Sequence, residues 1–132
     1  MTTDSTQETR ILTRPRTPAA ARDVVRALLR QGQGDASEMA VDDAVLVTSE
    51  LVTNALRHGG GLRGFECRVR PGFVEIAVED GSDVVPRSRP RTSLLMSGGH
   101  GWPSVCQLAD NVSVTHLPEG GKCIVARVPL AA

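Results

Sequence analysis

The sequence predicts an α/β two-layer sandwich, in which one mixed or antiparallel sheet is covered by helices on one face. Two observations carry this prediction. Apolar residues recur with a helical period over residues 19–29 and 41–56, and they alternate with charged residues over residues 65–70, as in strands with one buried face. The predicted order is strand, helix, helix, two strands, a long loop, a helix and two strands, without internal repeats.

Composition limits the class of protein. The 132 residues suffice for one domain with its own core, and 40% of them are hydrophobic, as is usual for globular proteins. Fifteen Lys and Arg balance fifteen Asp and Glu, which argues against a nucleic-acid or membrane-surface binder. No apolar run approaches the roughly 20 residues that span a bilayer, and the N-terminus lacks the apolar stretch of a secretory signal. We therefore expect a cytoplasmic protein.

The cysteines do not indicate a metal site or a disulfide framework. Cys67, Cys106 and Cys123 are an odd number without Cys-x-x-Cys or Cys/His spacing. We expect them to be buried free thiols.

The first elements follow from local signals. Residues 1–10 are polar and expected to be flexible, so that the domain covers residues 11–132. Residues 11–13 predict a short edge strand that ends before Pro15. Thr17-Pro18 has the pattern of a helix N-cap with proline at the first helical position, which predicts a helix over residues 19–29.

The central element is a helix predicted to begin near Ser37 or Val41 and to end at glycines 59–61. One broad side of its helical wheel is apolar, with Val41, Ala44, Val45, Leu51, Val52, Ala55 and Leu56. The opposite side carries Asp43, Glu50, Asn54, Arg57 and His58. Glu50 and Asn54 lie on successive turns of this polar face. Such a face can be merely solvated. Asn, however, does not favour helix interiors, so its presence on this face invites a functional interpretation.

Two hairpins and a loop complete the chain. Residues 65–69 and 73–78 predict one antiparallel hairpin, and residues 112–117 and 123–128 predict another. Residues 83–100 are a long irregular segment, of a kind that is usually a lid or disordered. Residues 101–110 predict a short helix.

Three polar features are predicted at the edges of this sheet: the Glu50/Asn54 face, Asp80 at a strand end, and the glycine-rich turn at residues 98–101. Each has a plain alternative, because Asp-Gly-Ser after a strand is most often a turn. A glycine-rich turn before a helix is either only a turn or an anion site. The sequence contains neither a P-loop nor a Rossmann dinucleotide motif.

In their order and spacing these features resemble the nucleotide-binding motifs of the GHKL ATPase superfamily, and within it the small branch of anti-sigma-factor serine kinases. Residues 50–58 (Glu-Leu-Val-Thr-Asn-Ala-Leu-Arg-His) resemble the N box. Residues 78–82 resemble a shortened first glycine box, and residues 99–101 with the following helix resemble the second. Gly-Gly-Lys at residues 120–122 fits the closing segment. The resemblance extends from about Thr17 onward and implies a Bergerat-type ATP-binding fold.

The resemblance also implies roles for single residues. Glu50 would be the general base or polarise the attacking hydroxyl, and Asn54 would coordinate Mg²⁺ through its amide oxygen. Asp80 would accept a hydrogen bond from the adenine amine and so select adenine over guanine. The backbone at Gly99 and Gly101 would approach the phosphates, with residues 83–100 as the lid. Further nucleotide-binding candidates are Arg57, His58, Ser82, His100 and Lys122, although Arg57 and His58 equally suit the negative end of a helix dipole.

Departures from the family pattern leave two functions open. His100 stands where arginine is common, Trp102-Pro103 replace small or aliphatic residues, and Ser82-Asp83 lack a second glycine. One function is an ATP- and Mg²⁺-dependent serine kinase that phosphorylates an anti-sigma-factor antagonist, sequesters a sigma factor and forms a homodimer. The other is a non-catalytic regulatory binding module of the same fold. A histidine-kinase catalytic fragment is disfavoured, because no dimerisation helix with a phosphoacceptor is present.

Overall fold

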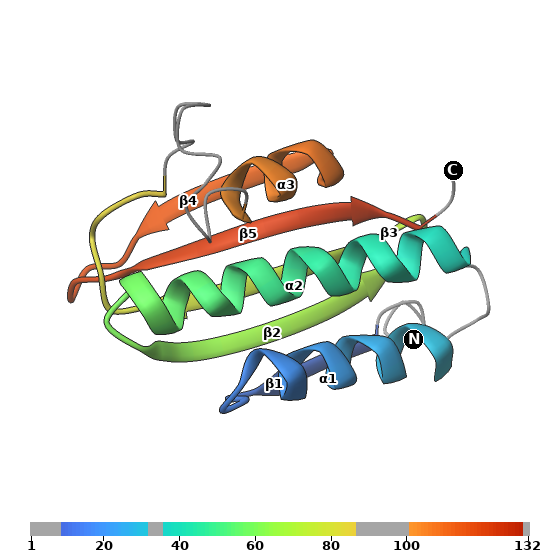
Figure 1. Cartoon of the computed structure of the whole chain (residues 1–132), viewed down its shortest axis with the longest axis horizontal. Coiled ribbons are helices and arrows are strands. Elements are labelled where there is room, and N and C mark those ends of the chain that lie inside the picture. Colours follow the sequence, from blue (N-terminus) through green and yellow to red (C-terminus); the bar gives the residue numbers. More distant parts are fainter. Residues whose placement is uncertain (1–8, 32–35, 87–100, 131–132) are drawn as a thin grey trace, which may run out of the picture.

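Figure 1 shows the computed structural model, which describes residues 9–31, 36–86 and 101–130. Its elements in chain order are β1 (Thr9–Thr13), α1 (Pro18–Gln31), α2 (Glu38–His58), β2 (Leu62–Arg70), β3 (Phe73–Asp80), α3 (Gly101–Leu108), β4 (Asn111–His116) and β5 (Lys122–Pro129). The predicted order of elements is confirmed, and most of their bounds lie within two residues of the prediction. In the described ranges, no helix combines the length and the apolar character needed to cross a membrane.

The described strands form one five-stranded sheet in the order β1-β2-β3-β5-β4, and every neighbouring pair is antiparallel. The helices lie on one side of this sheet (Figure 1), so the predicted two-layer sandwich is confirmed. Of the two predicted forms, mixed or antiparallel, the sheet takes the antiparallel one. Both predicted hairpins are present, and β1 is the edge strand predicted at residues 11–13.

The helix ends are set by the residues that the sequence indicates. The Ala20 amide donates to the Thr17 hydroxyl at 3.1 Å, and the Ala40 amide donates to the Ser37 hydroxyl at 3.0 Å. These bonds satisfy amides that have no partner inside the helix. At the other end of α2, the Gly59 amide donates to the Ala55 carbonyl oxygen at 3.1 Å.

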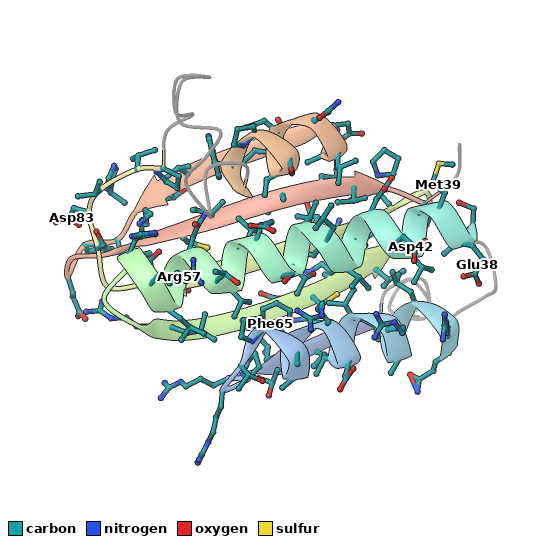
Figure 2. The ribbon with its side chains drawn as sticks, in the orientation of Figure 1. Glu38, Met39, Asp42, Arg57, Phe65 and Asp83 are labelled. Carbon is teal, nitrogen blue, oxygen red and sulfur yellow. The ribbon has the colours of Figure 1, made fainter. Side chains whose placement is uncertain are left out.

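The core lies between α1, α2 and the inner face of the sheet, and α2 supplies its largest share. Figure 2 shows Phe65 of β2 beneath the helices, and Phe65 is buried. The buried arc of α2 is turned toward Val47 and Thr48, which are both fully buried. This rotation moves Leu56 to the edge of the arc, where 41% of it is exposed. The prediction that Leu56 belongs to the apolar side is therefore wrong.

The outer face of the sheet carries charged side chains, as the alternation in β2 predicts. Glu66 pairs with Arg10 at 2.7 Å and with Arg68 at 2.9 Å. Pairs that are this accessible to solvent contribute only about 0–1 kcal/mol each. The buried face of the sheet therefore does most of the stabilising.

The cysteines only partly follow the prediction. Cys67 is buried in the core, Cys123 is half-buried and Cys106 is exposed, so the expectation of three buried thiols is wrong for Cys106. Cys106 lies on the outward side of the short helix α3. Burial, with a smaller effect of the Glu66 charge, raises the pKa of the Cys67 thiol to about 12. Cys67 thus stays a neutral thiol that packs as a small apolar side chain.

Candidate functional site

Four segments converge at the end of the sheet where β3 stops and β5 begins. Asp80, the last residue of β3, pairs in register with Leu62 of β2 and with Lys122 of β5. The amide of Gly81 donates to the Gly59 carbonyl oxygen at 2.7 Å, which ties this strand end to the end of α2. The candidate nucleotide-binding residues of α2, β3 and β5 are therefore held on one frame.

The side chain of Asp80 points inward and is almost fully enclosed, with 2% of the residue exposed. The alternation along β3 explains this position, because Val74, Ile76 and Val78 also face the core. The carboxylate accepts a hydrogen bond from the Lys122 ammonium at 3.0 Å and from the Ser82 amide at 2.9 Å. Both bonds end on Oδ1, so Oδ2 is the oxygen that remains for a further donor.

Lys122 and Asp80 form a buried ion pair. Their side chains are 3% and 4% exposed, and the Lys122 ammonium also donates to the Ser82 carbonyl oxygen at 3.1 Å. Burying either charge alone would cost several kcal/mol. Their placement as cross-strand partners lets each compensate for the other.

Two glycines make room for Asp80. A Cβ atom at Gly59 would lie 2.7 Å from Oδ2 of Asp80, and a Cβ at Gly121 would overlap the Asp80 carbonyl oxygen. Gly121 also has a φ of 90°, which disfavours other residues. Sequence reasoning identified Gly59 only as a helix end. The structure shows that it also lies against the carboxylate.

Two further residues fix the turn at residues 117–122 beside Asp80, and sequence reasoning missed both. Asp83 accepts a hydrogen bond from the Gly121 amide at 2.9 Å, and Arg63 donates to the Gly120 carbonyl oxygen at 3.0 Å. Asp83 belongs to the Ser82-Asp83 pair that lacks the second glycine of a fuller first glycine box, and its contact with Gly121 gives it a structural role. No sequence signal marks Arg63, since its role depends on a contact 57 residues away.

Glu50 and Asn54 lie in α2, on the N-terminal side of the helix end that packs against Asp80. Both are half-buried. With a rise of about 1.5 Å per residue, Asn54 precedes Gly59 by about 8 Å along the helix axis and Glu50 precedes it by about 14 Å. The helix thus presents the amide and then the carboxylate at increasing distance from Asp80.

Arg57 and His58 are exposed in the last turn of α2. Figure 2 shows Arg57 and Asp83 at one end of the molecule, with Glu38 and Asp42 at the other. The position of Arg57 and His58 is compatible both with contact to a phosphate group and with a favourable interaction with the helix dipole.

Comparison with protein families gives one assignment. The model of the histidine kinase-like ATPase domain matches residues 11–128. The chain belongs to this family. A comparison with curated proteins finds no match. The resemblance to the GHKL superfamily is confirmed at this level, and the antiparallel sheet with its helices agrees with the Bergerat-type fold that the resemblance implies.

In this histidine kinase-like ATPase domain, the residues that resemble a second glycine box directly precede or begin α3. Gly99 and His100 lie outside the described residues, and Gly101 is the first residue of α3. This helix contacts α2 and begins nearer the end of α2 than its start (Figure 1). Trp102, one of the departures from the family pattern, is half-buried and packs against the hydrophobic core. Pro103 occupies the first turn, where proline costs no helical hydrogen bond.

The donors available for a metal ion are few. In the described ranges, no cluster of three or more His, Cys, Asp and Glu side chains could hold a metal by itself. Asn54 and Glu50 offer hard oxygen atoms on successive turns of α2. Such a set fits Mg²⁺ that shares its coordination with phosphate and water oxygens, as Mg²⁺ at nucleotide sites commonly does.

Proposed function

We propose that this histidine kinase-like ATPase domain is a cytoplasmic anti-sigma regulatory factor that binds ATP and Mg²⁺ at the Asp80 end of its sheet. In this proposal it is a protein serine kinase that phosphorylates an anti-sigma-factor antagonist and also sequesters a sigma factor. The observation that carries the proposal is the enclosed Asp80 carboxylate, which keeps Oδ2 for a ligand donor next to the glycines that make room for it.

Each residue has a defined task in the proposed site. Asp80 Oδ2 accepts a hydrogen bond from the exocyclic amine of adenine. Asn54 offers its amide oxygen to Mg²⁺, and the first turn of α3 offers backbone amides to the phosphates. Asp80 ends β3 beside the end of α2, and Asn54 and then Glu50 follow along α2 with increasing distance from that end. This order fits the order of the adenine base, the phosphates and the attacking hydroxyl.

The proposed catalytic residue is Glu50. Bound ATP would supply the γ-phosphoryl group, and Mg²⁺ would neutralise its developing charge. The Glu50 carboxylate would orient the serine hydroxyl of the antagonist and accept its proton. The antagonist, the sigma factor and a second copy of the chain are proposed as partners on the strength of the family resemblance.

A second candidate function is a regulatory binding module of the same fold that holds its partners with weak or lost nucleotide use. The Lys122–Asp80 ion pair favours it, because the buried carboxylate is already neutralised without a nucleotide. His100 and Trp102-Pro103, which depart from the kinase pattern, point the same way. The two functions differ in whether ATP binds and whether its phosphate is transferred.

The experiment is a calorimetric titration with ATP·Mg²⁺. We expect one saturable site in the unchanged chain and at least about tenfold weaker binding in Asp80→Asn, because the variant loses a charged hydrogen-bond acceptor. Asp42→Asn is the matched control, since it makes the same change at an exposed position near the start of α2. Asp42 lies at the opposite end of the molecule from Asp83, which is close to the proposed site (Figure 2). Thermal unfolding of each variant verifies the fold. Absence of heat in the unchanged chain would leave only the partner-binding role.

A further inference from the structure

Lys122 is the buried cation of the candidate site. Its ammonium group carries three N–H donors. Two of them are used, by Asp80 Oδ1 at 3.0 Å and by the Ser82 carbonyl oxygen at 3.1 Å. The third has no acceptor among the described residues. A cation with 3% of its side chain exposed has little water to satisfy that donor, so a ligand acceptor would be favoured there.

The pair places an acceptor and a donor side by side. Asp80 Oδ2 remains free of the two hydrogen bonds that end on Oδ1, and the Lys122 ammonium lies within hydrogen-bond distance of the same carboxylate. Adenine has the complementary arrangement, because its exocyclic amine is a donor and the adjacent ring nitrogen N1 is an acceptor. Guanine has the opposite arrangement at these positions, with a carbonyl oxygen followed by an N1–H donor.

We propose that Lys122 is a base-specificity residue: its third N–H donates to adenine N1 while Asp80 Oδ2 accepts from the adenine amine. This inference rests on the proposed binding of ATP at Asp80. With both contacts formed, guanine meets two mismatches, an acceptor opposite Oδ2 and a donor opposite the ammonium. Selection of adenine then depends on the pair rather than on Asp80 alone.

A purely structural role for Lys122 makes a different prediction. If the ammonium only neutralised Asp80, its removal would disturb the carboxylate and lower the binding affinity of ATP and of 1-deaza-ATP by the same factor. A direct contact with N1 instead makes the effect of Lys122 depend on whether the ligand has an N1 acceptor. The two roles are therefore distinguished by the ligand and not only by the variant.

The test compares ATP with 1-deaza-ATP, in which a C–H group replaces N1, by calorimetric titration in the presence of Mg²⁺. For the unchanged chain we expect 1-deaza-ATP to bind at least about tenfold more weakly than ATP, the loss of one charged hydrogen bond. In Lys122→Met, ATP binding falls, and the two nucleotides bind within about twofold of each other because the N1 donor is gone. A variant that retains the full preference for ATP would overturn the proposal.

The comparison of the two nucleotides on the unchanged chain remains decisive if Lys122→Met does not fold. Equal binding of ATP and 1-deaza-ATP to the unchanged chain overturns the role of Lys122 and leaves the proposed function intact. Binding of neither nucleotide overturns the proposed function and the inference with it. Thermal unfolding of Lys122→Met in the absence of nucleotide shows whether its affinities refer to a folded protein.

Discussion

The substitution Glu50→Gln is expected to lower phosphoryl transfer from ATP to a serine of the antagonist by a factor on the order of 10²–10⁴, the usual contribution of a general base. Glutamine keeps the shape of the side chain but accepts no proton at neutral pH. ATP affinity should change by no more than about twofold, because the base acts on the attacking hydroxyl and not on the bound nucleotide. Transfer of labelled γ-phosphate to the antagonist, measured beside an ATP titration, gives both quantities.

The matched control for this substitution is Glu38→Gln. Glu38 lies in the first turn of the same helix, is exposed, and lies at the opposite end of the molecule from Asp83 (Figure 2). Its loss should leave transfer unchanged. Transfer by Glu50→Gln at the level of this control would remove Glu50 from the mechanism, whereas equal losses of transfer and of ATP affinity would make its role structural.

Gly121→Ala is expected to destabilise the fold by about 3 kcal/mol or more, in the upper range of single substitutions. The added Cβ would overlap the backbone carbonyl oxygen of Asp80, and the φ of 90° already disfavours alanine. Backbone cannot move aside as a flexible side chain can, so β3 and β5 would have to separate. Equilibrium unfolding in urea measures the loss.

Gly120→Ala isolates the steric part of this effect. Gly120 precedes Gly121 and has a φ of 95°, but a Cβ there would meet no atom within 4 Å. It should therefore cost only the conformational part, about 1–2 kcal/mol. Similar losses for the two variants would show that the close packing of Gly121 on Asp80 is not important for stability.

Local signals in the sequence predicted most of the fold. Thr17 and Ser37 cap their helices because each side-chain oxygen accepts a hydrogen bond from the backbone amide three residues later. Such a contact is local in the sequence. Alternation predicted both hairpins, since one face of each strand is buried. The insertion of β5 between β3 and β4 was not predicted, because it depends on pairing between distant segments. Leu56 was placed wrongly because a wheel does not show how a helix is rotated over its sheet.

The site was predicted less completely than the fold. The sequence placed Asp80 at a strand end and Glu50 with Asn54 on one helix face, and the structure has them there. It did not indicate the ion pair of Asp80 with Lys122, which joins residues 42 positions apart through strand register. The close approach of Gly59 to the carboxylate likewise depends on tertiary packing. Sequence motifs indicate which residues are candidates for a site, but they do not show which of those residues form ion pairs with one another.

The most direct measurement of the central proposal is the mapping of ATP·Mg²⁺ onto the folded chain by backbone amide chemical shifts. Binding at the Asp80 end predicts saturable shifts at Asn54, Gly81, Ser82 and Gly121. The amide of Gly72, in the turn between β2 and β3 at the far end of the sheet, should not shift. Shifts confined to that far end, or no shifts at millimolar ATP·Mg²⁺, would contradict the proposal that a nucleotide binds at Asp80.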